Sequence, residues 1–227
     1  MVVDRRERWS DYARKSILDA NDGIATAAFV AQGFGTAGAS HHTLLVAGAA
    51  VILAGGFAAA AARYAEVRTE WEMNNSELEA ERASIAAHPE AEFEELVEIY
   101  ESKGLSAELA REVAETLTQR DAIAAHADAE LHLDSTASPR TSLPEALTAG
   151  LFYALGASVP LAVVNVSPAG LRIEFTSVAV LLALTFTGWV TSWLTGLKPF
   201  RLVRRNLILG AATLLAGLII GLLGSGS

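Results

Sequence analysis

The sequence predicts an all-α, polytopic membrane protein with five transmembrane helices and a cytoplasmic three-helix module. Apolar residues make up 52% of its 227 residues and the mean hydropathy is +0.33, which is a high apolar share for a soluble domain. Four long stretches lack Asp, Glu, Lys and Arg, namely residues 23–62, 146–171, 175–197 and 206–227. Residues 63–145 instead hold 20 of the 26 acidic residues and 7 of the 17 basic ones.

This segregated composition, with a net charge of −9, excludes an ordinary cytosolic enzyme, a nucleic-acid binder and a disordered protein. The absence of cysteine excludes disulfides, thiolate metal sites and cysteine nucleophiles. The sequence contains no phosphate loop, nucleophile triad or zinc-peptidase motif, so we do not expect an enzyme. The charged segment Met1–Lys15 lacks the apolar region and cleavage site of a signal peptide.

The predicted spans follow from the length of the apolar stretches, because a helix needs about 20 apolar residues to cross the hydrocarbon core. The first stretch is long enough for two helices, with a turn at its most polar part, Gly38–His42. The five predicted spans are residues 18–38, 43–63, 145–166, 174–195 and 206–223. An odd number of spans places the two termini on opposite sides of the membrane.

The basic residues predict the orientation, because Lys and Arg gather on the cytoplasmic side. Five of them lie in residues 1–15 and four in residues 198–205, whereas the turn between the first two spans has none. We therefore expect a membrane protein with a cytoplasmic N-terminus and acidic module, and an outside C-terminus. The many Gly and Ala residues of the first two spans allow close helix packing, either within one bundle or at the seam of a homodimer.

The chain divides into residues 1–65 with two spans, residues 66–134 with the acidic module, and residues 135–227 with three spans. The first module helix continues the second span, without Gly or Pro, to about Ala87. Pro89 opens the second helix, about 90–102, and Gly104 ends it. Ser106 is a good N-cap for the third helix, about 107–132.

Five carboxylates crowd the second module helix: Glu92, Glu94, Glu95, Glu98 and Glu101. They either form a solvated face or bind a cation. Like charges three and four residues apart repel and destabilise a helix, and a divalent cation would remove this repulsion. Glu92 and Glu95 can point at one ion, and Glu81 can complete the ligand shell. His126 and Glu130 share one face of the third helix.

Such ligands suit Fe²⁺, Mn²⁺ or Zn²⁺, and we expect no tightly bound cofactor. No His follows a Glu by three residues, so a ferritin-like di-iron centre is not expected.

Several motifs together resemble the vacuolar iron transporter family, including its bacterial members, over nearly the whole chain. On this resemblance we expect a protein of the bacterial inner (plasma) membrane. They are Asp22-Gly23-Ile24, Ala54-Gly55-Gly56 with Tyr64, residues 89–96, residues 99–105, residues 125–131, Ala154-Leu155-Gly156-Ala157 and Pro160-Leu161. The resemblance implies five spans, a homodimer and a Glu-rich cytoplasmic metal-binding module. It also implies export of Fe²⁺, or of Mn²⁺ in some members, in exchange for protons.

Carried over by position, the resemblance makes Asp22 the intramembrane acid, and Glu81, Glu92, Glu95 and Glu130 the module ligands. His126 stands where plant members have Met and many bacterial members have His. The chain also departs from the family pattern. Ala59 replaces a Met and Arg63 a Glu in the second span, and Ser84 and Ala127 stand at expected Glu positions.

The leading hypothesis is therefore a divalent-metal transporter that uses Asp22, since a carboxylate inside a span is costly and functional by default. The alternative for Asp22 is a cap at the start of the first span. A metal-sensing or scaffolding membrane protein that has lost transport is the second hypothesis, favoured by Ala59 and Arg63. The third is a transporter of another substrate, in which Arg63 attracts an anion.

Overall fold

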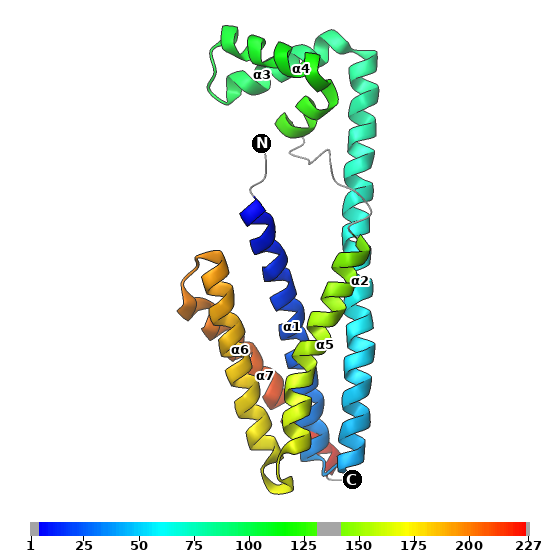
Figure 1. The fold of residues 1–227 in the computed structure, drawn as a ribbon, viewed down its shortest axis with the longest axis vertical. Helices are drawn as coiled ribbons and strands as arrows, with labels where there is room; N and C mark the ends of the chain where they lie inside the picture. Colours follow the sequence, from blue (N-terminus) through cyan, green and yellow to red (C-terminus); the bar gives the residue numbers. More distant parts are fainter. Residues whose placement is uncertain (1–4, 131–141, 226–227) are drawn as a thin grey trace. The chain divides into compact units, whose positions relative to one another are not determined.

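The computed structural model describes residues 5–130 and 142–225, and these residues form helices and turns without any strand (Figure 1). The elements are α1 (Arg5–Thr36), α2 (His41–Ala87), α3 (Pro89–Ser102), α4 (Ala107–Ala129), α5 (Ser142–Val166), the 3-10 helix η2 (Ala169–Leu171), α6 (Arg172–Thr195) and α7 (Pro199–Ser225). The predicted all-α class is confirmed.

Four helices in the described ranges are long and apolar enough to cross a membrane, namely α2, α5, α6 and α7. The first predicted span lies in α1, which is not among the four. Polar residues lower its hydropathy: Asp19, Asn21, Asp22 and Gln32 all lie within it.

Most predicted helix boundaries agree with the structure to within a few residues. The chain turns between α1 and α2 through Gly38, whose φ is +78°, and α2 runs without interruption to Ala87 as expected. The last predicted span, 206–223, lies within α7, which begins earlier, at Pro199, a residue well suited to the first turn of a helix. Arg201, Arg204 and Arg205 therefore belong to a helix and not to a loop.

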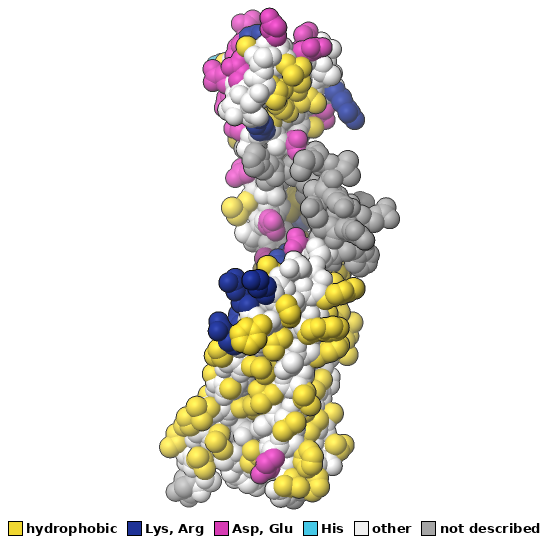
Figure 2. Space-filling model, turned by 90° about the vertical axis from the view of Figure 1, so that its left-hand side faces the viewer, with side chains coloured by type: hydrophobic (Ala, Val, Ile, Leu, Met, Phe, Trp, Pro, Cys, Tyr) yellow, Lys and Arg dark blue, Asp and Glu magenta, His cyan; other side chains and the backbone are white. Residues whose placement is uncertain are grey.

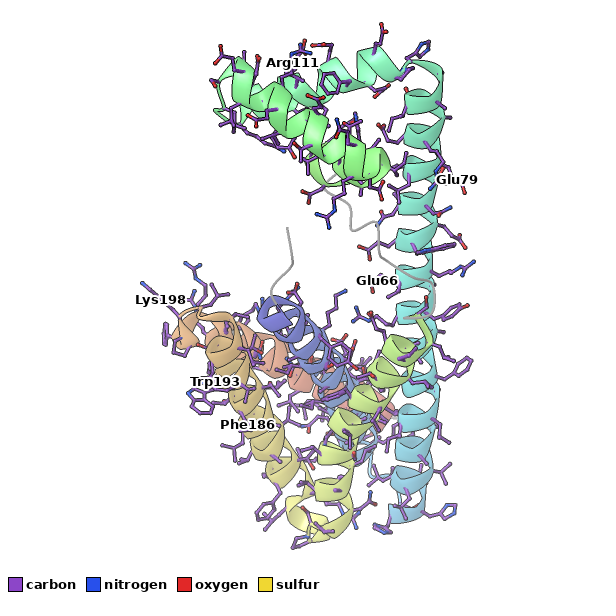
Figure 3. All side chains as sticks on the ribbon, turned by 45° about the horizontal axis from the view of Figure 1, so that its top comes forward. Glu66, Glu79, Arg111, Phe186, Trp193 and Lys198 are labelled. Carbon is purple, nitrogen blue, oxygen red and sulfur yellow. The ribbon has the colours of Figure 1, made fainter. Side chains whose placement is uncertain are left out.

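The chain forms two compact units. Among the described residues, the acidic unit comprises 65–130 with Ser142, and the apolar unit comprises 5–64 and 143–225. Figure 2 shows carboxylates gathered on the acidic unit and hydrophobic side chains spread over the apolar unit. Phe186 and Trp193 are 63% and 76% exposed and project away from α6 (Figure 3), as side chains that face lipid do.

In the apolar unit, α1 contributes to the packing of all the other helices. Ile24 and Ala28 pack against α6 and α7, whereas Ala27 packs against α2 and α5. Gly23 lies directly against the backbone of α5 at Tyr153, so that any side chain larger than hydrogen would overlap it. This close approach fixes α1 at the residue next to Asp22.

The acidic unit has its own small core between α3 and α4. Leu96 and Val97 of α3 are buried against Ala110, Ala114 and Ala125 of α4. Pro89 occupies the first turn of α3, and the Ser106 side chain accepts a hydrogen bond from the backbone N–H of Leu109, as predicted. The last residues of the predicted third helix, 131–132, and the predicted domain boundary at 134 lie outside the described residues.

Candidate metal centre

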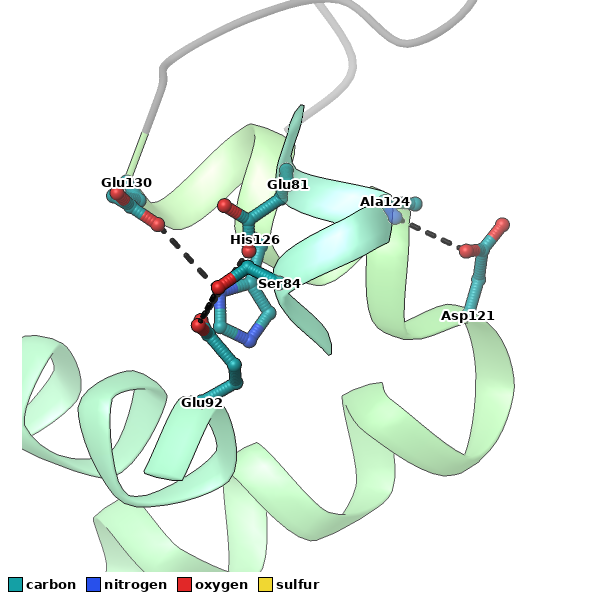
Figure 4. Close-up of polar contacts among 7 residues, drawn as sticks. All are labelled: Glu81, Ser84, Glu92, Asp121, Ala124, His126 and Glu130. Carbon is teal, nitrogen blue, oxygen red and sulfur yellow. Dashed lines mark hydrogen bonds and ion pairs between the residues drawn. The ribbon is translucent and has the colours of Figure 1, made fainter. Parts of the chain in front are cut away.

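The imidazole of His126 is the centre of a cluster of carboxylates in the acidic unit (Figure 4). Its side chain, near the end of α4, is only 2% exposed. Its Nδ1 atom lies 3.0 Å from Oε1 of Glu81, 3.6 Å from Oε2 of Glu130 and 3.9 Å from Oε2 of Glu92. The three predicted ligands Glu81, His126 and Glu130 offer ligand atoms within 4.8 Å of one another.

Two atoms of this cluster are buried without a hydrogen bond: Nδ1 of His126 and Oε1 of Glu81. Although 3.0 Å apart, they do not have the geometry of a hydrogen bond. Buried polar atoms in proteins normally have partners. Two facing atoms that lack a hydrogen-bond partner are suited to bind one cation. Its ligands would be the neutral imidazole nitrogen and the carboxylate oxygens.

Ser84 orients Glu92, which is the next residue of the cluster. The Ser84 hydroxyl of α2 donates a hydrogen bond to Oε1 of Glu92, while Oε2 of the same carboxylate is turned towards His126. Ser84 stands at a position where the sequence resemblance implies a Glu. It contributes to the site as a partner of a ligand, which no sequence pattern had indicated.

Glu95, another of the six predicted metal residues, is exposed on α3 and, like Glu92, does not belong to the group of Glu81, His126 and Glu130. It still affects the cluster through its charge, because it contributes to raising the pKa of Glu81. Glu95 follows Glu92 by three residues, so the two side chains leave the helix in similar but not identical directions. Of the two carboxylates that sequence spacing had assigned to one ion, Glu92 has its Oε2 atom 3.9 Å from Nδ1 of His126.

Electrostatics in the cluster disfavour the charged form of the Glu81 carboxylate when no cation is present. Burial raises the pKa of Glu81 and the Glu130 carboxylate raises it further, while His126 opposes the shift. Glu92 and Glu95 add to the increase. A divalent cation would reverse this repulsion, and an oxygen-rich set with one imidazole suits Fe²⁺, Mn²⁺ or Zn²⁺.

Asp22, the predicted intramembrane acid, lies on the exposed surface of α1, one residue before the close contact of Gly23 with α5. The hydroxyl of Thr26 donates a hydrogen bond to the backbone carbonyl of Asp22, one turn away. Asp22 is therefore in a different unit from the His126 cluster.

Arg63 forms an ion pair with Asp19, although the sequence suggested a free positive charge there. An Arg63 guanidinium nitrogen lies 3.4 Å from both carboxylate oxygens of Asp19, and the two side chains are only 12% and 16% exposed. The positive charge of Arg63 is thus paired with a carboxylate that lies 44 residues away in the sequence. Ala59, by contrast, packs in the apolar cluster of Tyr153 and offers no ligand.

Comparison with known proteins identifies the family. A family model described as the VIT family matches residues 13–222. The chain belongs to the VIT family. It is 29% identical to vacuolar iron transporter 2 of Oryza sativa subsp. japonica over 204 residues, which cover 88% of this chain and 82% of that protein. It is 29% identical to vacuolar iron transporter 1 of Tulipa gesneriana over 205 residues, or 89% and 83% of the two chains.

A third relative, the vacuolar iron transporter of Acanthamoeba castellanii, is 29% identical over 152 residues. The match covers 67% of this chain and 55% of that protein, so the chain spans just over half of its length. Membership of the VIT family confirms the predicted resemblance. With the four membrane-length helices of the described residues, it identifies an integral membrane protein, and the relatives that it matches are named as transporters.

Proposed function

We propose that this VIT family protein transports Fe²⁺ or Mn²⁺ out of the cytoplasm in exchange for protons, and that its acidic unit captures the ion first. The observation that carries this proposal is the convergence of Glu81, Glu130 and the unbonded Nδ1 of His126 in a chain with four membrane-length helices. The relatives named vacuolar iron transporters support iron as the ion. The mixed oxygen and nitrogen ligands would accept Mn²⁺ or Zn²⁺ as well.

In this proposal α1 is the fifth transmembrane helix. Its polar residues make α1 too polar to cross a membrane by itself. However, α1 packs against all four apolar helices, which would shield it from lipid. Lys and Arg are concentrated before residue 16 and in residues 198–205. The positive-inside rule then assigns the N-terminus and the acidic unit to the cytoplasm and the C-terminus to the other side.

Asp22 is the proposed ion-binding carboxylate of the membrane. Since Arg63 already neutralises Asp19, Asp22 is the carboxylate left to attract a cation at the start of the charge-free stretch 23–62. Its exposure on α1 supports a homodimer, because a carboxylate facing hydrocarbon is costly and a second copy would cover it. A mass measurement in nanodiscs that returned only monomer would contradict the dimer.

A metal-binding membrane protein without transport is the second candidate function. Ala59 favours it, because an apolar cluster now occupies a position at which the family resemblance implies a Met ligand. The anion-transport alternative loses its main support, since the Arg63 guanidinium that would attract the anion is paired with Asp19.

Flux into proteoliposomes tests the proposal. The purified protein is reconstituted, and entry of Fe²⁺, Mn²⁺ and Zn²⁺ is followed with a trapped fluorescent chelator, with and without a proton gradient. We expect flux of Fe²⁺ or Mn²⁺ above that of protein-free liposomes, and faster flux when the gradient drives protons in the opposite direction. Metal binding without flux under any gradient would favour the second candidate.

A further inference from the structure

The helix that carries His126 is not continuous. Inside α4, Asp121 has φ −168° and ψ 99°, so an extended residue separates residues 107–120 from a short terminal segment, 122–129. The sequence had predicted one uninterrupted helix. The Asp121 carboxylate accepts a hydrogen bond from the backbone N–H of Ala124 at 3.0 Å (Figure 4), as the N-cap of a new helix does.

The other end of the terminal segment is held by a residue from outside α4. Lys103, which follows α3, donates a hydrogen bond from Nζ to the backbone carbonyl of Ala129 at 3.1 Å. The last carbonyls of a helix have no partner within it, and a lysine near that end satisfies one of them. The ammonium group also lies 5.1 Å from the centre of the Tyr100 ring.

His126 and Glu130 are therefore carried by a short segment that is fixed at both ends. Between the two fixed ends, Ala125 and Ala129 are buried in the core against α3, and His126 is 2% exposed. The cap at Asp121 determines where the segment starts and the bond from Lys103 determines where it ends. Because side chains turn by about 100° per helical residue, a slip of one residue would direct the imidazole away from Glu81.

We propose that Asp121 and Lys103 are positioning residues that hold the terminal segment of α4 so that His126 and Glu130 meet Glu81 at the metal centre. This inference rests on the proposed function of that centre. Neither residue contributes a ligand atom to the group of Glu81, His126 and Glu130. They act through the backbone of the segment that carries two of its ligands.

The charges of these two residues allow a sharp test. Lys103 is a cation, so simple electrostatics predicts that its removal strengthens the binding of a divalent cation, whereas the positioning role predicts weaker binding. Asp121→Ala and Asp121→Asn remove the same charge, but Asn retains a good N-cap. Ser106→Ala is the matched control, because it removes a side-chain cap from the opposite end of the same helix.

The experiment uses the full chain in nanodiscs and titrates Mn²⁺ alone by calorimetry. We expect Asp121→Ala to bind Mn²⁺ about tenfold more weakly, in the range seen when residues that orient metal ligands are removed. Asp121→Asn and Ser106→Ala should bind nearly as the wild type does. Lys103→Met should also bind more weakly, and Lys103→Arg should recover most of that loss.

Several results would overturn the inference. If Asp121→Ala and Asp121→Asn lose the same Mn²⁺ affinity, the lost negative charge explains the loss, and not the lost cap. If Lys103→Met binds Mn²⁺ more tightly, Lys103 acts by repelling the cation. If Ser106→Ala loses as much Mn²⁺ affinity as Asp121→Ala, the general stability of α4 explains the loss. If the wild type binds Mn²⁺, His126→Ala does not, and Asp121→Ala binds normally, only the inference fails. Absence of binding in the wild type, or binding that survives His126→Ala, would reject the proposed centre as well.

Discussion

The acidic unit gathers three carboxylates around one buried imidazole, whereas the apolar unit pairs the carboxylate of Asp19 with the guanidinium of Arg63. In the first case the repulsion between the carboxylates is left in place, and burial with neighbouring charge raises the pKa of Glu81. In the second case a half-buried charge is neutralised within the protein. The difference supports the proposal that a cation binds at the His126 cluster and at Asp22, whereas the carboxylate of Asp19 is already paired.

The largest expected effect on stability comes from breaking the pair in the apolar unit. Asp19→Asn leaves the Arg63 guanidinium without its carboxylate and should destabilise the protein by about 3 kcal/mol, because a guanidinium cannot lose its charge. Arg63→Gln should cost less, since a carboxylate can become neutral by binding a proton. Thermal unfolding in detergent measures both.

The double variant Asp19→Asn/Arg63→Gln is the control for this pair, because it removes both charges. We expect it to be more stable than Asp19→Asn alone. If the double variant shows the sum of the two single losses, the ion pair does not couple the two residues, and the contrast between the units would not hold.

A smaller effect, on Mn²⁺ affinity, is expected when two carboxylates of α3 that carry the same charge are compared. Glu92 accepts a hydrogen bond from Ser84 and faces His126, whereas Glu95 is exposed. Glu92→Gln should weaken Mn²⁺ binding about tenfold. Glu95→Gln should change it by less than about twofold, because an exposed charge is screened by salt. Calorimetry at 0.15 M salt that finds equal losses would show that general acidity, and not geometry, attracts the ion.

The smallest effect concerns an ion pair on the surface of the acidic unit. Arg111 donates to both carboxylate oxygens of Glu94 at 2.9 and 2.6 Å, and this hydrogen bonding holds the pKa of Glu94 below its usual range. Its contribution to stability is present above the ordinary Glu pKa of about 4.3 and is lost as the pH falls through the lowered value.

Arg111→Gln should therefore lower the melting temperature slightly at pH 7 and by less at pH 3. Both side chains of the pair are more than half exposed, so we expect a change much smaller than that of Asp19→Asn. A difference between wild type and Arg111→Gln that grows on acidification would contradict the sign of this prediction.

The sequence predicts the helices well because their boundaries depend on local chemistry. Pro89 and Ser106 begin α3 and α4 as expected, and the chain reverses at Gly38. The interruption at Asp121 could not be predicted, because Asp is also tolerated inside helices. Whether its side chain caps a new segment depends on the packing of that segment against α3.

The candidate site was predictable only in part. The spacing of His126 and Glu130 predicted two ligands on one helix face, and the structure brings the predicted Glu81 of α2 into the same group. Spacing alone assigned Glu92 and Glu95 to the same ion, since it does not show which side chain turns towards the imidazole. The pairing of Arg63 with Asp19, 44 residues apart, depends on the packing of α1 against α2, for which a single sequence holds no signal.

The central claim is that capture at His126 and passage at Asp22 are separate events. The most direct test measures Fe²⁺ flux and Mn²⁺ binding in the same nanodisc and liposome preparations for wild type, Asp22→Asn and His126→Ala. Asp22→Asn should lose flux and keep its Mn²⁺ affinity. His126→Ala should lose affinity and still show flux when Fe²⁺ is raised. Undiminished flux in Asp22→Asn, or loss of both properties in both variants, would contradict the account.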